Sequence, residues 1–170
     1  MTIRPSLTTD LPALMPIFDE ARRTIAALGI DQWQDGYPNR EVIAADIERG
    51  ESYAVEIDGN ICGTFVMLTD GEPTYNKIYD GTWLTGDTPD GYLAIHRVAI
   101  SVAHRGSGIS SAIIAHAADF AKAHGKTSLR IDTHEGNIVM RRMLEKNGFT
   151  HCGTIYLASG AARVAYEKVI

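Results

Sequence analysis

Apolar residues recur with a helical period over most of the first fifty positions of the chain. A helix is predicted over residues 9–29, with Pro12 tolerated in its first turn and a glycine at its end. A second, short helix is predicted between the capping residue Asn39 and Gly50. Residues 2–5, which precede both helices, form a short predicted strand.

After residue 51, most apolar residues fall in short runs typical of β-strands. Residues 52–57 and 61–68 are predicted strands, and the Asp-Gly-Asn sequence at 58–60 is a strong hairpin signal between them. The connection 69–91 is rich in Gly, Pro, Asp and aromatic residues, and its length is typical of a functional loop. The elements predicted after it are a strand at 92–100, a helix at about 108–124, a strand at 128–132, a helix at about 137–146, and strands at 149–157 and 163–169.

This order of elements predicts the fold class. A mixed α/β (α+β) domain is expected, with a parallel crossover between the strands 92–100 and 128–132. The chain has 170 residues, of which 45% are hydrophobic and 22% charged, which is the size and composition of one ordinary globular domain. No internal repeat or second domain is evident, so residues 1–170 are predicted to form a single domain.

Composition and charge exclude several classes of partner. The net charge is −5 and no block of Lys or Arg occurs, so no nucleic-acid surface is expected. No apolar run reaches the length of a membrane helix and the N-terminus lacks a secretion signal, so a cytoplasmic protein without a membrane partner is expected. Cys62 and Cys152 have no metal-ligand spacing, and two buried, reduced thiols are expected.

The turn between the strand 92–100 and the following helix has the composition of an anion site. Residues 105–108 read Arg-Gly-Ser-Gly and stand directly before the helix. Glycines let a ligand approach the backbone, and the free amides at a helix start attract negative charge. An ordinary tight turn is the alternative reading. The segment is neither a dinucleotide fingerprint nor a Walker loop, because the further glycine and the Gly-Lys-Ser/Thr sequence are missing.

Three segments in this half of the chain resemble the GNAT acetyltransferase superfamily. Residues 105–110 resemble its Arg/Gln-x-x-Gly-x-Gly/Ala motif, with Ser110 in place of the last small residue. Residues 97–100 are similar to the strand that pairs with the pantetheine arm of acetyl-CoA. Residues 137–149, which open on Asn and end in Gly-Phe, are similar to the family's later helix. The resemblance is strong over roughly residues 92–157.

The resemblance implies a fold, a co-substrate and a set of contacts. The implied fold is a mostly antiparallel central sheet whose parallel pair is splayed at the acyl-CoA site, flanked by about four helices. Acetyl-CoA is the implied co-substrate, with its pyrophosphate on the loop and its pantetheine along the preceding strand. The residues expected to contact it are Val98, Ala99, Ile100, Arg105, Gly106, Ser107, Gly108, Ile109, Ser110, Ser111 and Asn137, of which Asn137 could equally be a simple helix cap.

The residues that move protons are less well marked. The family's usual acid for the leaving thiolate is a tyrosine at the position of Leu144, and Tyr156 is a candidate substitute for it. His96 is the leading candidate for the base, since a neutral imidazole accepts protons near pH 7; a hydrogen-bonded structural histidine is the alternative. Asp132 and His134 are further candidates at the end of the next strand. No metal is expected, because no ligand motif surrounds His134.

The acceptor side is predicted from aromatic residues in variable segments. Trp33 and Tyr37, in a polar stretch with Gly and Pro, and Trp83, in the long connection, are the candidate acceptor-binding groups. The leading hypothesis is an N-acetyltransferase that acts on a primary amine of a small molecule, an amino acid derivative or a peptide. A non-catalytic acyl-CoA-binding regulator of the same fold is the alternative, and a homodimer is possible.

Overall fold

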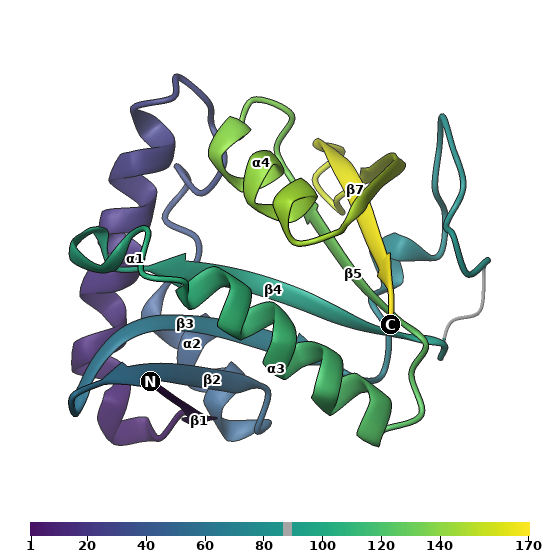
Figure 1. Ribbon diagram of the computed structural model, residues 1–170. Helices are drawn as coiled ribbons and strands as arrows, with labels where there is room; N and C mark the ends of the chain where they lie inside the picture. Colours follow the sequence, from purple (N-terminus) through teal and green to yellow (C-terminus); the bar gives the residue numbers. More distant parts are fainter. Residues whose placement is uncertain (87–89) are drawn as a thin grey trace. The chain divides into compact units, whose positions relative to one another are not determined.

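The computed structural model describes residues 1–86 and 90–170, and every predicted helix and strand forms within this part of the chain (Figure 1). Residues 87–89 of the predicted loop 69–91 lie outside the described residues. None of the helices in the described part is long and apolar enough to cross a membrane. The elements are β1 (Thr2–Pro5), α1 (Leu11–Ala26), α2 (Arg40–Glu48), β2 (Ser52–Ile57), β3 (Asn60–Leu68), β4 (Tyr92–Ile100), α3 (Ile109–Ala123), β5 (Ser128–Thr133), α4 (Ile138–Lys146), β6 (Thr150–Tyr156) and β7 (Ala162–Val169), with short 3₁₀ turns at Thr8–Asp10, Pro73–Tyr75 and Val102–His104.

The strands form one mixed sheet, which confirms the predicted fold class. Their order is β1-β2-β3-β4-β5-β7-β6, and β4 and β5 are the parallel pair. The chain divides into two compact units, residues 1–67 with 97–113 and residues 68–96 with 114–170. Strand β4 contributes residues to each unit. That residues 1–170 form a single domain stays a prediction.

The first unit is built on the antiparallel strands β1, β2 and β3. The hairpin between β2 and β3 has left-handed backbone at both Asp58 (φ 51°) and Gly59 (φ 78°), which the right-handed twist of a two-residue hairpin requires. The apolar side of α1 packs with Ile43 of α2 and Ala99 of β4. Helix α2 begins where predicted, because the Asn39 side chain accepts a hydrogen bond from the Val42 amide at 2.9 Å.

The second unit contains the antiparallel strands β5, β7 and β6 and the short parallel pairing of β4 with β5. Its core joins aromatic residues of the long connection to apolar residues of the strands. Trp83 and Tyr75 are both buried there, with their ring centroids 5.4 Å apart. The connection is therefore not a loose loop, and its described part carries some of the core of this unit.

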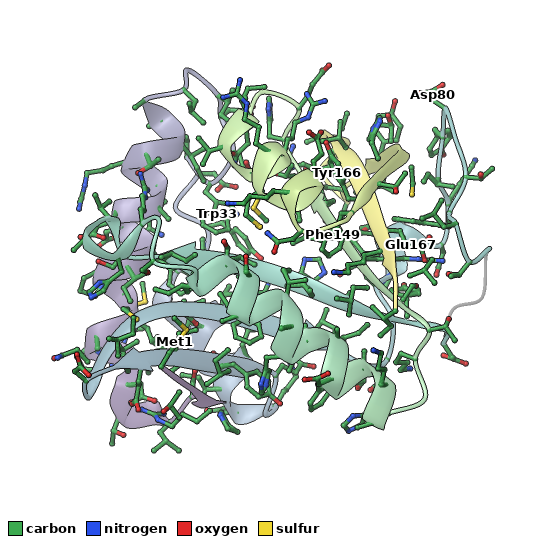
Figure 2. The ribbon with its side chains drawn as sticks, viewed as in Figure 1. Met1, Trp33, Asp80, Phe149, Tyr166 and Glu167 are labelled. Carbon is green, nitrogen blue, oxygen red and sulfur yellow. The ribbon has the colours of Figure 1, made fainter. Side chains whose placement is uncertain are left out.

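A buried carboxylate on β7 holds that connection in place. Glu167 accepts hydrogen bonds from the hydroxyls of Thr85 and Ser128, both at 2.6 Å, and from the amide of Leu84, and it pairs with Arg130 at 2.9 Å. Figure 2 shows Glu167 on β7, turned toward the connection. Burial would raise the pKa of Glu167, but these donors outweigh it and lower that pKa. Glu167 is thus ionised, and it provides an acceptor for the Leu84 amide of the connection.

We expect the Glu167→Ala variant to lose about 3–5 kcal/mol of unfolding free energy, because it leaves the Arg130 guanidinium buried without its counter-charge. The double variant Glu167→Leu with Arg130→Met removes both charges and is expected to lose less than the single variant. Urea denaturation of the three proteins measures both effects. A single variant as stable as the wild type would contradict this role of Glu167.

Candidate active site

The loop before α3 is anchored by hydrogen bonds to neighbouring elements of its own unit. The amide of Val102 donates to the carboxylate of Glu20 at 2.8 Å, and the guanidinium of Arg105 donates to the hydroxyl of Thr24 at 2.7 Å. Both acceptors lie on α1. The amide of Ser101 donates to the carbonyl of Cys62 on β3 at 2.9 Å. These hydrogen bonds thus hold the loop in position without a ligand.

The two glycines of the loop adopt conformations that other residues rarely do. Gly106 and Gly108 have φ angles of 79° and 84°. Apart from their chain neighbours, no atom of the described residues lies within 4 Å of the place that a Cβ would take at either one. The Ala112 amide donates to the Gly108 carbonyl at 3.0 Å, so the amides of residues 109–111 are the first-turn amides that lack an acceptor within the helix. An open surface with free amides at a helix start fits a diphosphate.

Two side chains of the loop are already occupied. Ser107 donates its hydroxyl to the His104 carbonyl at 2.5 Å, and Arg105 holds Thr24 as described above. In this conformation the Ser107 hydroxyl has no further proton to donate, whereas Arg105 uses only part of its N–H groups for Thr24. Contact between a pyrophosphate and the side chains of Arg105 and Ser107 stays a prediction. The same holds for Ser110 and Ser111.

Strand β4 leaves its parallel neighbour shortly after it begins. The pairing with β5 runs from Tyr92 with Ser128 to Ala94 with Arg130, and no further pair follows among the described residues. Both strands continue beyond this point, β4 to Ile100 and β5 to Thr133. The later backbone groups of β4 on that edge are therefore available to an added extended chain, as the splayed pair of the predicted fold requires.

Arg97 marks an irregularity within β4. Its φ of 51° is in the left-handed region, which is rare for a non-glycine residue in a strand. Its guanidinium forms two contacts to the buried carboxylate of Asp46 in α2, at 2.7 and 2.9 Å, and donates to the hydroxyl of Tyr37. Burial raises the pKa of Asp46, although the charges of Arg97 and Arg49 oppose this rise. These contacts hold the irregular backbone in one conformation.

His96 forms a dyad with a carboxylate from the long connection. Its Nε2 lies 3.2 Å from Oε2 of Glu72, and each side chain is 18% exposed. The ring of Tyr75 stacks on the imidazole with centroids 5.8 Å apart, and the Tyr75 hydroxyl donates to Asp132 at 2.7 Å. Nε2 is buried against the carboxylate, which leaves Nδ1 as the nitrogen that would accept a proton if His96 acts as a general base.

Glu72 is strongly acidic in this arrangement. Burial would raise its pKa, but the hydrogen bond and the charge of His96, together with Thr74, lower it to about 2. Because the folded pKa lies below the ordinary value of 4.5, the Glu72 carboxylate stabilises the fold above pH 4.5, and this stabilisation is lost as the pH falls toward 2.

We therefore expect the wild type to lose more unfolding free energy than the Glu72→Gln variant when the pH falls from about 5 to about 2.5. Denaturant titrations at several pH values measure this difference. Parallel pH curves for the two proteins would show that the carboxylate has no such coupling.

The other predicted proton-transfer residues have different surroundings. Asp132 accepts the Tyr75 hydroxyl and so lies beside the dyad, whereas the imidazole of His134 accepts the Gly136 amide at 2.9 Å in the turn after β5. Tyr156 is 46% exposed on β6 and packs edge-on against Tyr79. Leu144 is fully buried on α4, and its hydrocarbon side chain has no proton to donate.

Asn137 and Trp83 have roles in folding. The Asn137 side chain caps α4 by accepting a hydrogen bond from the Met140 amide at 3.2 Å, which agrees with the simple-cap reading. Trp83 is only 3% exposed and donates to the Tyr75 carbonyl at 3.0 Å. The expectation that Trp83 contacts an acceptor is therefore corrected, because the ring is enclosed by the core.

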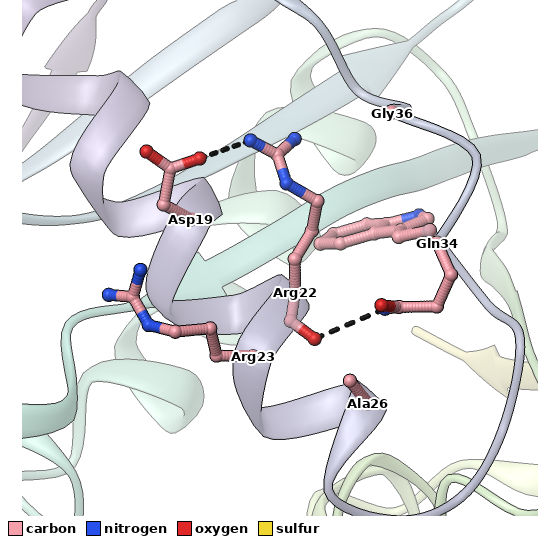
Figure 3. Close-up of a pocket in the computed structure, with 7 residues that line it drawn as sticks. Asp19, Arg22, Arg23, Ala26, Gln34 and Gly36 are labelled. Atoms are coloured by element: carbon pink, nitrogen blue, oxygen red, sulfur yellow. Dashed lines mark hydrogen bonds and ion pairs between the residues drawn. The ribbon is translucent and has the colours of Figure 1, made fainter.

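Trp33 lies at a cavity on the first unit. A cavity of about 350 Å³ is lined by α1 and the segment after it, and Figure 3 shows these residues. Gln34 closes one side by donating to the Arg22 carbonyl at 3.1 Å, and Arg22 pairs with Asp19. Tyr37 packs edge-on against Trp33, so both predicted acceptor residues are in this part of the unit. The lining residues are Asp19, Arg22, Arg23, Ala26, Trp33, Gln34 and Gly36.

Glu72 and the Arg97–Asp46 pair, which belong to different units, were not predicted from the sequence. The pairing of Glu72 with His96 depends on the turn at Pro73–Tyr75. Glu72 caps that turn by accepting the Thr74 amide at 3.1 Å, and the Glu-Pro-Thr sequence was the available signal. No comparable signal marks Arg97.

The open glycine turn at a helix start in the first unit and the imidazole–carboxylate pair in the second are each features that an acyl-CoA-dependent transferase needs. The sequence model of the GNAT acetyltransferase family matches residues 12–149, and the chain belongs to this family. This confirms the resemblance drawn from residues 92–157.

Solved structures give the same result. A GNAT-family acetyltransferase from Streptococcus agalactiae is 36% identical, with a TM-score of 0.89 over 99% of this chain and 95% of that one. A GNAT-family acetyltransferase from Listeria monocytogenes is 22% identical, with a TM-score of 0.71 over 99% and 94%. The PaiA N-acetyltransferase of Thermoplasma acidophilum, solved with coenzyme A, is 18% identical, with a TM-score of 0.73 over 99% and 98%. Among curated proteins, no sequence matches.

Acetyl-CoA is the co-substrate of this family, and the residues of the loop fit it. The fit rests on the open glycines and the first-turn amides of α3 described above. Within residues 1–86 and 90–170, no group of three or more His, Cys, Asp and Glu side chains could hold a metal ion.

Proposed function

We propose that this protein transfers the acetyl group of acetyl-CoA to a primary amine of a small molecule, an amino acid derivative or a peptide. The observation that carries the proposal is the His96–Glu72 dyad, whose histidine lies on β4 beyond the last residue paired with β5. Family membership supplies the acyl donor. The dyad supplies the group that an amine acceptor requires, since an amine is protonated at neutral pH and cannot attack until it loses a proton.

In the proposed reaction, the neutral imidazole of His96 accepts a proton from the ammonium group, directly or through one water molecule. The Glu72 carboxylate stabilises the imidazolium that forms. The amine nitrogen then attacks the thioester carbonyl carbon, so that a C–N bond forms, the C–S bond breaks, and the electron pair leaves with sulfur. The second proton of the nitrogen passes to water as the neutral amide forms. A backbone amide of residues 98–100 is the proposed donor to the carbonyl oxygen, and the loop amides hold the pyrophosphate.

The Trp33 and Tyr37 segment is the proposed acceptor side. Support comes from the cavity beside Trp33 and from the hydrogen bond between Tyr37 and Arg97, which follows His96 directly on β4.

The experiment that tests the proposal follows thiol release from acetyl-CoA with a panel of amines. We expect at least one primary amine to release thiol, and CoA to raise the unfolding temperature of the protein. If CoA stabilises the protein but no amine releases thiol, the non-catalytic acyl-CoA-binding regulator replaces the enzyme. If butyryl-CoA supports faster release than acetyl-CoA, the acyl group transferred is a longer one.

A further inference from the structure

The end of β5 carries a buried hydroxyl without a partner. Thr133, the last residue of this strand, is 1% exposed, and its Oγ1 has no hydrogen-bond partner among residues 1–86 and 90–170. Its backbone is paired with Val164 of β7, so the residue is held firmly in the sheet. A buried hydroxyl with no partner costs stability, and in a native protein such a group calls for an explanation.

The position of Thr133 relative to the end of the β4–β5 pairing suggests that explanation. The last pair joins Ala94 to Arg130, so Thr133 stands three residues beyond it on β5. His96 stands two residues beyond it on β4. Thr133 and the proposed base are thus both on the part of the two strands where each has lost the other as a hydrogen-bonding neighbour.

Thr133 and the dyad face opposite sides of the sheet. Asp132 accepts the hydroxyl of Tyr75, and Tyr75 stacks on His96, so Asp132 shares the face of the dyad. Successive side chains of a strand point to opposite faces, and the hydroxyl of Thr133 therefore points to the other one. In the reaction, the amine approaches the acyl carbon from one side and the sulfur leaves from another. The base that deprotonates the amine and the group that donates to the sulfur are therefore expected on different sides of the acyl carbon.

We propose that the hydroxyl of Thr133 donates a hydrogen bond to the sulfur of the departing CoA thiolate. This inference rests on the proposed function. It assigns to Thr133 part of the task that a tyrosine at position 144 would perform, since Leu144 has no donor. The balance needs only water as a further proton acceptor: the first ammonium proton goes to His96, the C–S electron pair stays on sulfur, and the second proton leaves the nitrogen for water as the neutral amide forms. Thr133 keeps its proton while it donates.

The test compares Thr133→Val, which removes the hydroxyl at nearly constant shape, with Thr133→Ser, which keeps it. For Thr133→Val we expect kcat to fall about tenfold or more with little change in the KM for acetyl-CoA, because the bond strengthens only as charge develops on sulfur. The same variant without ligand is expected to unfold about 2–4 °C higher than the wild type, because an unpaired buried hydroxyl is gone. Thr133→Ser is expected to resemble the wild type in both measurements.

A structural hydroxyl would give the opposite stability result. A lower unfolding temperature for Thr133→Val would show that the hydroxyl has a partner in the free protein, and an unchanged kcat would show that it does not serve the sulfur. Either result overturns the proposal.

A binding measurement separates this inference from the proposed function. The thiol of bound CoA, followed by the ultraviolet absorbance of its thiolate, is expected to titrate at lower pH in the wild type than in Thr133→Val. If no amine releases thiol, the proposed function fails while this titration still decides the role of Thr133. Equal titration in the two proteins overturns the role of Thr133 alone.

Discussion

The Gly108→Glu variant is expected to lose CoA affinity by about a hundredfold or more, because it changes the backbone and the charge of the proposed pyrophosphate site together. The φ of 84° at Gly108 is strained for any residue with a Cβ, so the first-turn amides of α3 shift when Glu is introduced. The new carboxylate also repels the pyrophosphate at a helix start that otherwise attracts negative charge. Calorimetric titration with CoA measures the loss.

Gly125 offers a matched control for this variant. It has a φ of 71°, no atom lies within 4 Å of its Cβ position, and it follows the other end of α3. Gly125→Glu therefore introduces the same charge and a similar backbone strain away from the loop, and we expect it to keep its CoA affinity. Unchanged affinity in Gly108→Glu, or equal losses in the two variants, would remove the loop from the site.

The His96→Ala variant is expected to lose about 10²–10⁴ in turnover at neutral pH while it binds CoA nearly as well as the wild type. Without the imidazole, the proposed base is missing, so the ammonium group is not deprotonated in the site. The loss therefore appears in kcat with a saturating amine. Imidazole added to the solution is expected to restore part of the turnover.

Two further variants sharpen this prediction. His151, which is exposed on β6, serves as the control, and His151→Ala is expected to keep full turnover. Glu72→Gln retains the imidazole but removes the charge that stabilises its protonated form, so a smaller loss of about tenfold is expected. Turnover in His96→Ala equal to that of the wild type would show that His96 is a structural residue.

Periodicity was sufficient to predict the elements that frame the site. The caps and stops around α2 and α4 are local signals, and Asn39 and Asn137 both cap as the sequence indicated. The left-handed backbone of the turn at residues 106–108 was also predictable, since glycines adopt positive φ without strain in either reading of the turn. These features depend on neighbouring residues, so one sequence contains enough information for them.

The long connection was harder to interpret, because its structure depends on distant partners. Its Gly, Pro and Asp content is typical of an exposed loop, yet Trp83 and Tyr75 are buried within it. What makes this possible is Glu167, more than eighty residues away, which satisfies the amides of Leu84 and Thr85. The Glu72–His96 contact depends on the same fold of the connection. The periodicity of apolar residues gives no information on contacts between residues so far apart in the sequence.

Arg97 shows a second limit of the sequence pattern. The alternation along β4 predicts regular strand through this position, whereas the backbone is left-handed there. The conformation is stabilised by Asp46 and Tyr37, which come from segments about fifty and sixty residues earlier. A tertiary ion pair thus overrides the local preference of an arginine, and only the structure reveals it.

The most direct test of the central claim is the ratio of products formed from acetyl-CoA and the most active amine. Mass spectrometry counts the N-acetylated amine while a thiol assay counts free CoA. Acetyl transfer from the thioester to nitrogen predicts one acetylated amine for each CoA released, with both products reduced together in His96→Ala. Free CoA without acetylated amine, or product formation that does not depend on His96, would contradict the account.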